Sequence, residues 1–174
     1  MKKIVLTTVS VLALGVNTSF AAEDSADGTA HATLLQPTTI ENVTDMQFGN
    51  MLKGTHAVKL DTSDNRTGEA EYLIGSTGDK EPKSGRFKIE GTPNQAITIT
   101  SPASFNVSNG NNAMTVDNVQ LKLNGGGDQT GGADFSGTIK DDGTAELMVG
   151  GTLNVTESSP EGDYTGTYNI KVSY

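Results

Sequence analysis

The sequence predicts an all-β fold built as a single antiparallel β-sandwich, and three observations support this. In residues 164–174, larger or apolar side chains alternate with polar ones, which is the two-residue period of a strand with one buried face. Short runs with similar alternation recur along the chain between clusters of Gly, Pro, Asn and Asp, the residues that favour turns. After residue 21, no stretch keeps the apolar spacing of a helix over three turns.

The first 21 residues predict a secretory signal peptide. Lys2 and Lys3 precede an apolar stretch from Ile4 to Val16, and Ser19-Phe20-Ala21 places small residues where signal peptidase cleaves. The apolar stretch is too short to span a membrane. We expect cleavage before Ala22 and export to the periplasm, the cell surface or the extracellular space, without membrane insertion after cleavage.

The mature chain is acidic and lacks cysteine. Without Lys2 and Lys3, 10 basic residues remain against 21 acidic ones, a net charge near −11. This charge repels nucleic acid and anionic lipid, so neither is an expected partner. The absence of cysteine excludes disulfides, thiolate metal sites and cysteine nucleophiles, so the fold must rely on its apolar core.

The mature chain divides into a leader, residues 22–33, and a β-sandwich domain, residues 34–174. The leader begins with small and acidic residues and is expected to be flexible. From Ala30 onward, the positions of Ala30, Ala32 and Leu34 alternate with those of His31, Thr33 and Leu35, as in a strand. The leader is therefore either a flexible segment or a donor-like extension, which could add a strand to the sheet of a neighbour or to its own sheet.

Within the domain, the runs predict about nine or ten short strands, the size of an immunoglobulin-like sandwich. One strand is expected at 70–74, after a polar turn at 61–68. Residues 109–112 (Asn-Gly-Asn-Asn) predict a hairpin turn, because Asn and Gly tolerate positive φ. The apolar residues switch parity at Asp117-Asn118, which predicts a β-bulge or tight corner. The predicted core comprises Phe48, Phe87, Ile89, Ile97, Ile99, Phe105, Leu121, Leu147, Leu153, Tyr168, Ile170 and Val172.

No arrangement of residues predicts catalysis, and we expect no enzyme and no cofactor. The two histidines, His31 and His56, have no carboxylate at metal-ligand spacing, and Gly-x-Ser-x-Gly is absent. The loop 125–132 is rich in glycine and contains Asp128, but it has at most one and a half copies of a calcium-binding repeat. A plain surface loop is the preferred interpretation there. Calcium binding by this loop or by residues 61–65 stays open as the alternative.

Seven segments of the mature chain carry a family resemblance: Ile40–Gly49, Phe87–Gly91, Ala96–Thr100, Met114–Asp117, Val149–Val155, Gly162–Tyr168 and the terminal strand. Together they resemble a family of bacterial exported domains known mainly as a domain of unknown function. The resemblance covers nearly the whole mature chain and is most specific at its C-terminal end. Members of that family are similar to cysteine-free fimbrial subunits, and the resemblance implies an exported, β-rich protein without catalytic residues.

Together, these observations lead us to expect a pilin-like surface subunit, with a structural or adhesive role, that assembles by strand addition. Its partners would be like subunits or a periplasmic chaperone. One alternative is a self-complete, monomeric secreted binding module, with calcium as a possible ligand. A second is a glycan-active enzyme that uses carboxylates such as Asp128 and Asp134. The expected strand-exchange residues are Ala30, Ala32, Leu34, Tyr168, Ile170, Val172 and Tyr174.

Overall fold

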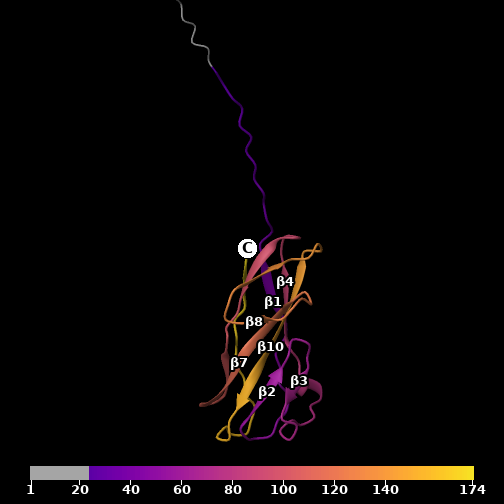
Figure 1. Cartoon of the computed structure of the whole chain (residues 1–174), viewed down its shortest axis with the longest axis vertical. Helices are drawn as coiled ribbons and strands as arrows, with labels where there is room; N and C mark the ends of the chain where they lie inside the picture. The colour runs from indigo at the N-terminus through magenta and orange to yellow at the C-terminus, as the bar shows by residue number, and fades with distance from the viewer. Residues whose placement is uncertain (1–23) are drawn as a thin grey trace, which may run out of the picture. The chain divides into compact units, whose positions relative to one another are not determined.

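A computed structural model describes residues 24–174 (Figure 1). The expected signal peptide therefore lies outside the described residues. Residues 34–174 form one compact unit. Residues 24–33 are exposed and belong to no strand. Among the described residues, no helix has the length and apolar character needed to cross a membrane.

The domain is all-β and its strands pair antiparallel, which confirms the predicted fold class. The 3-10 helix η1 (Gly78–Lys80) is a single short turn. The structure has 11 strands, slightly more than expected, because short segments such as β3 and β8 also pair. The strands are β1 (Thr39–Thr44), β2 (His56–Leu60), β3 (Arg66–Gly68), β4 (Gly85–Glu90), β5 (Ala96–Thr100), β6 (Phe105–Asn109), β7 (Asn112–Leu123), β8 (Gln129–Thr130), β9 (Phe135–Thr138), β10 (Thr144–Val155) and β11 (Lys171–Ser173).

The long strand β10 organises the larger, eight-stranded sheet. Along one side, its first half pairs with β4 and its second half with β2, so that these two strands follow one another (Figure 1). Its other side pairs with β7, which in turn carries β6 and β8. The strands β1 and β3 lie outside β4 and β2 respectively. β10 is thus the common partner of β2, β4 and β7.

A second sheet of three strands, in the order β11-β5-β9, packs against the first. Ile97 and Ile99 of β5 belong to one buried cluster with residues of β4, β7 and β10. The two sheets therefore share a core, as expected for a sandwich. A second cluster fills the rest of the domain and consists of Phe48, Val58, Leu60, Met114, Val116, Leu153 and Val155.

The predicted core residues are all partly or fully buried. Four are half-buried at the border of the clusters, namely Phe87, Phe105, Tyr168 and Val172. The others are buried: Phe48, Ile89, Ile97, Ile99, Leu121, Leu147, Leu153 and Ile170. All of these residues lie on the apolar parity of their runs, so the alternation along the chain correctly predicts the inner face of most strands.

Two local predictions about β7 are confirmed. β6 and β7 pair up to Asn109 and Asn112, so Gly110-Asn111 forms the hairpin loop, with Gly110 at a φ of 60°. The parity switch at Asp117-Asn118 is a bulge: the register with β10 shifts there, and Asn118 has a φ of 46°. Val116 and Val119 consequently both face the core.

The expected strand at 70–74 is wrong, and so is the turn at 61–68. The turn is shorter, because the Asp61 carboxylate accepts hydrogen bonds from the N–H groups of Ser63 (2.8 Å) and Asn65 (2.9 Å). The chain therefore returns early, and β3 begins at Arg66. In the segment 70–74 only Leu73 forms a β-bridge, to Met51.

Arg66 explains why this irregular region is nevertheless ordered. Its guanidinium donates hydrogen bonds to the carbonyl oxygens of Phe48 (3.1 Å), Asn50 (2.9 Å) and Ile74 (2.7 Å). These carbonyls come from two loops that have few ladder bonds of their own. One charged side chain thus satisfies the polar backbone groups that a strand would otherwise have paired.

Candidate functional site: the C-terminal segment

The C-terminal segment, defined as residues 164–174, keeps the predicted alternation for most of its length. Ile170 is buried, and Tyr164, Tyr168 and Val172 are half-buried. The intervening polar side chains, from Thr165 to Ser173, are all exposed. Tyr174 is 46% exposed, although its hydroxyl is engaged. The segment therefore has one inner and one outer face, as a strand does.

The segment is not one continuous strand, which corrects the expected ribbon. Thr165 exchanges two backbone hydrogen bonds with Ser108 of β6, at 2.7 and 3.0 Å. Residues 171–173 form β11 and pair with β5. Among the described residues, 166–169 have no backbone hydrogen bond. The segment thus leaves the edge of the larger sheet and joins the edge of the smaller one.

The break in pairing follows from unequal chain lengths. Thr165 and Lys171 are six positions apart, whereas their partners Thr100 and Ser108 are eight apart. Two residues between β5 and β6 therefore have no counterpart on the segment, and a regular ladder cannot continue across them. This mismatch cannot be predicted from the sequence, because it depends on which strands meet.

Gly166 allows the segment to pass close to β6. A Cβ atom at this position would overlap with the carbonyl oxygen of Asn106 and lie 3.0 Å from the Cα of Val107. Any other residue would have to displace the backbone of one strand. Gly166 is therefore required by a close approach of two backbones.

Tyr168 anchors the middle of the segment by aromatic packing. Its ring stacks on Phe105, with centroids 4.8 Å apart, and meets Phe87 edge-on at 5.9 Å. Its hydroxyl lies over Gly85, where any Cβ atom would overlap with it. Burial, followed by the nearby charge of Asp45, raises the pKa of the Tyr168 hydroxyl, so the phenol stays neutral. Tyr168 serves as an apolar anchor.

A shallow pocket of about 370 Å³ opens where the backbone pairing is interrupted. Phe105 and Tyr168 contribute its aromatic wall, and Thr167, Asn169 and Lys171 border it from the segment. Ser101 also lines it; this residue is 6% exposed, and its Oγ has no hydrogen-bond partner in the structure. The pocket is therefore bordered by the stretch 166–169, which has no backbone hydrogen bond in the described structure.

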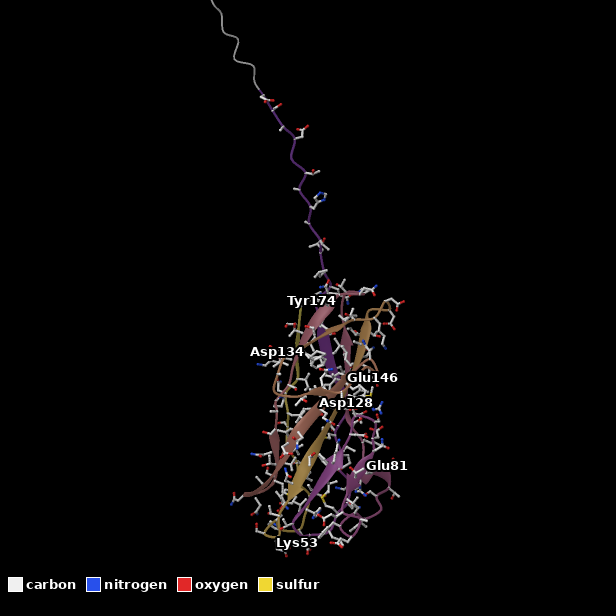
Figure 2. The ribbon with its side chains drawn as sticks, viewed as in Figure 1. Lys53, Glu81, Asp128, Asp134, Glu146 and Tyr174 are labelled. Carbon is white, nitrogen blue, oxygen red and sulfur yellow. The ribbon has the colours of Figure 1, made fainter. Side chains whose placement is uncertain are left out.

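Tyr174 fastens the end of the segment to the beginning of the domain. Its hydroxyl donates to the carbonyl oxygen of Gln36 and accepts from the backbone N–H of Thr92 (3.1 Å). The N–H of Gln36 in turn donates to Oγ1 of Thr92 (2.7 Å). Figure 2 places Tyr174 and Lys53 at opposite ends of the domain. Sequence reasoning had singled out Tyr174 but not Gln36 or Thr92, since neither carries a recognisable pattern.

The expected donor residues lie before the first strand. Ala30 and Ala32 are exposed and belong to no strand. Leu34, the first residue of the compact unit, is 97% exposed. The first described residue in a strand is Thr39. On the other side, Tyr168, Ile170 and Val172 all pack in or against the same core cluster.

The carboxylates that could have formed a calcium or catalytic site are occupied by protein groups. Asp128 accepts a hydrogen bond from Thr62 (2.7 Å) and forms an ion pair with Lys122 (3.3 Å). Asp134 accepts from the hydroxyl of Thr100 (2.5 Å). Over residues 24–174, no three His, Cys, Asp or Glu side chains are grouped so that they could hold a metal ion. The two aspartates named as possible catalytic groups are thus engaged separately.

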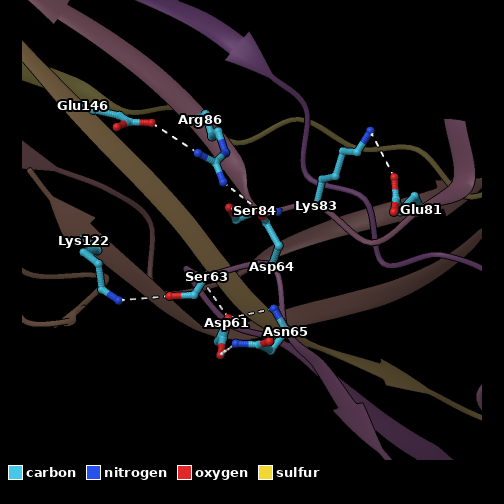
Figure 3. Close-up of polar contacts among 10 residues, drawn as sticks. All are labelled: Asp61, Ser63, Asp64, Asn65, Glu81, Lys83, Ser84, Arg86, Lys122 and Glu146. Carbon is cyan, nitrogen blue, oxygen red and sulfur yellow. Dashed lines mark hydrogen bonds and ion pairs between the residues drawn. The ribbon is translucent and has the colours of Figure 1, made fainter. Parts of the chain in front are cut away.

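The polar turn 61–65 is likewise built from internal hydrogen bonds (Figure 3). Asp64 accepts from the N–H (2.7 Å) and hydroxyl (2.6 Å) of Ser84 and forms an ion pair with Arg86 (2.7 Å). Arg86 also reaches Glu146 at 3.3 Å. These bonds tie the β2–β3 turn to β4. Asp64 therefore has a structural role.

The histidines have different surroundings. His31 lies exposed in the leader. His56 is buried at the start of β2, where its ring stacks on Tyr72 with centroids 4.2 Å apart and an angle of 6° between the planes. Neither ring nitrogen of His56 has a hydrogen-bond partner in the described structure. His56 therefore contributes to the packing between β2 and the loop that contains Tyr72.

Comparison with known proteins gives one match. The family model described as "Domain of unknown function (DUF4402)" matches residues 38–174. The chain belongs to this family. The DUF4402 region begins next to β1 and covers every strand of the domain, including the C-terminal segment. No curated protein and no solved structure matches the chain.

Proposed function

We propose that this DUF4402 protein is an exported, pilin-like surface subunit that joins its neighbours by strand addition. In this proposal, the end of the leader, residues 30–34, is the donor strand. A neighbouring domain is the acceptor. The role of the protein is then structural or adhesive, and it needs neither a catalytic residue nor a bound cofactor.

The supporting observation is the state of the donor segment. The described leader forms no strand, and Leu34 exposes 97% of its side chain to solvent. Exposure of this leucine and the alternating alanines to water is unfavourable. Their burial in a second molecule would lower the free energy by about 25 cal/mol per Å² of apolar surface. Main-chain hydrogen bonds would supply the remaining affinity, and the alternation would set the register.

The spacing of the donor residues suits the proposed role. Ala30, Ala32 and Leu34 would all face the acceptor core, while His31 and Thr33 would face solvent. The two alanines allow a close approach to a domain surface, and the leucine provides most of the apolar area. A strand of this length places its side chains on two opposite faces, so substitutions on the two faces should have different effects.

The test compares two full-length mature variants with the same added charge. Ala32→Asp places a carboxylate on the inner face of the donor, whereas Thr33→Asp places it on the outer face. Light scattering coupled to size-exclusion chromatography, over a range of concentrations, should show assemblies for the unaltered protein and for Thr33→Asp. The Ala32→Asp variant should remain monomeric, because burying an unpaired carboxylate costs several kcal/mol.

Two results would contradict the proposal. If the unaltered protein is a monomer at all concentrations, the self-complete binding module becomes the better description. If both aspartate variants behave alike, the two faces of the leader are not distinguished, and the donor strand is excluded. Neither substitution lies in the compact unit, so circular dichroism should show that both variants keep the fold.

A further inference from the structure

We infer that the C-terminal segment is the acceptor edge, and that it receives residues 30–34 of a second copy of this chain. This inference rests on the proposed function and adds the place where the donor binds. In the described structure, Thr165 pairs with β6 and residues 171–173 pair with β5, both along one side of the segment. Its other side is a row of backbone groups without a strand beside it, which is the surface that an added strand requires.

The other edges of the two sheets are less suited to accept a strand. β1 contains a register shift between Asn42 and Thr44 and carries Glu41. β3 has three residues and β9 has four, which is short for a stable ladder. Bulges, charges and short strands are the devices that keep an edge from pairing. β1 is therefore protected by its register shift and its charge, whereas β3 and β9 share their shortness with β11.

The C-terminal segment differs from these edges because its alternation of inner and outer side chains continues beyond β11, although β11 itself has three residues and carries Lys171. The segment is eleven residues long and contains no proline and no acidic residue, and Lys171 is its single charged side chain. No described strand pairs with its outer side. Backbone groups left unpaired at a sheet edge are an aggregation hazard unless a specific partner covers them.

The side chains of donor and acceptor are complementary in pattern. On the segment, Tyr168, Ile170 and Val172 point inward at two-residue intervals and form the border of the core. Ala30, Ala32 and Leu34 have the same interval and would extend this apolar row by one strand. The polar residues Thr165, Thr167 and Asn169 would lie beside His31 and Thr33 on the solvent face.

The geometry at the start of the domain favours a second copy over the chain's own leader. Gln36 is held at Tyr174, and β1 then runs on from Thr39. To lie beside its own segment and then enter β1, the chain would have to reverse direction within residues 34–38. That stretch has no glycine or asparagine and, although it contains Pro37, shows neither a turn nor a positive φ in the structure.

Disulfide trapping between two populations tests the inference, because the protein has no cysteine of its own. One population carries Thr33→Cys, and the other carries a cysteine on the segment, Thr167→Cys or Asn169→Cys. A disulfide forms only when the Cα atoms are about 4.4–6.8 Å apart. After mixing under mild oxidation, disulfide-linked heterodimers should form in several-fold higher yield than with a control cysteine on the β1 edge, Glu41→Cys.

A second control separates docking from random collision. Adding Ala32→Asp to the Thr33→Cys population should abolish the heterodimer with Thr167→Cys or Asn169→Cys. Preferential linkage to Glu41→Cys would overturn the inference and leave the proposed function intact, because the donor would then use another edge. Equal linkage at all positions would also overturn it. Absence of assembly in the unaltered protein, measured by light scattering, would instead remove the proposed function itself.

Discussion

The hydroxyl of Tyr174 donates a hydrogen bond to the carbonyl oxygen of Gln36, 138 positions earlier in the chain. Thr92 completes this contact: its N–H donates to the Tyr174 hydroxyl, and its Oγ1 accepts from the N–H of Gln36. Three segments from different parts of the sequence thus meet at one end of the domain. The contact secures the C-terminal segment where it lies beside the start of the domain.

Replacing Tyr174 with phenylalanine should lower the free energy of unfolding by about 1 kcal/mol, the usual net contribution of a hydrogen bond. The ring remains, so the change isolates the hydroxyl. Urea denaturation measures the effect, and hydrogen exchange at the Thr92 amide should accelerate. The exposed neighbour provides a control: Ser173→Ala should leave both measurements nearly unchanged.

Replacing Gly166 with alanine should destabilise the docking of the C-terminal segment. The new Cβ would overlap with the Asn106 carbonyl oxygen, so either the segment or β6 must move. We expect a loss of about 1–3 kcal/mol, the range found for overpacked sites. Gly75→Ala is the matched control, since a Cβ atom there has nothing within 4 Å. Equal thermal melts for the two variants would contradict the close approach.

Replacing Ile170 with aspartate should unfold the domain. Ile170 is 7% exposed and belongs to the main core cluster, where an unpaired carboxylate costs several kcal/mol. Asn169→Asp adds the same charge one residue earlier, on the exposed face, and should be tolerated. Far-ultraviolet circular dichroism distinguishes the two. A folded Ile170→Asp variant would show that the segment does not contribute to the core.

The stability of the protein should fall at acid pH, in part through Asp64. Burial raises the pKa of Asp64, but hydrogen bonds from Ser84 and Arg86 and the charge of Arg86 outweigh it and hold the pKa below its ordinary value of 3.8. The folded state thus binds this proton less readily than the unfolded state. Ionised Asp64 therefore stabilises the folded state above pH 3.8, and this stabilisation is lost as the pH falls through the lower, folded-state pKa.

Thermal melts of the unaltered protein and of Asp64→Asn, recorded between neutral pH and pH 2, measure this contribution. The variant should be less stable at neutral pH, and its melting temperature should fall less on acidification. The substitution Asp24→Asn, in the exposed leader, should leave the pH profile unchanged. A variant profile parallel to that of the unaltered protein would contradict the role of Asp64.

Calcium should not stabilise the protein. The oxygens of Asp128 are engaged by Thr62 and Lys122, and those of Asp61 by its own turn, so a cation would have to displace existing bonds. Thermal melts with calcium and with a chelator should therefore coincide. A shift of several degrees would establish binding and would favour the calcium-associated binding module.

The faces of the strands could be predicted from the sequence because they depend on local alternation. The bulge at Asp117-Asn118 was predictable for the same reason, since a parity switch is visible in the chain itself. The turn at 61–68 was misplaced because its length depends on the Asp61 carboxylate capping its own loop, a contact that residue type alone does not specify. The role of Arg66 was missed because its three acceptors are backbone carbonyls of two other loops.

Local sequence patterns are enough to predict that the chain is all-β, which side chains face inward in most strands, and that a polar leader precedes the domain. These properties follow from the two-residue period of a strand and from turn chemistry, both of which are local. Which strands are neighbours becomes clear from the three-dimensional fold alone. The same holds for the path of the C-terminal segment from the larger sheet to the smaller one, and for its side without a neighbouring strand. Such pairings join residues far apart in the chain, so their register depends on the lengths of all the intervening segments.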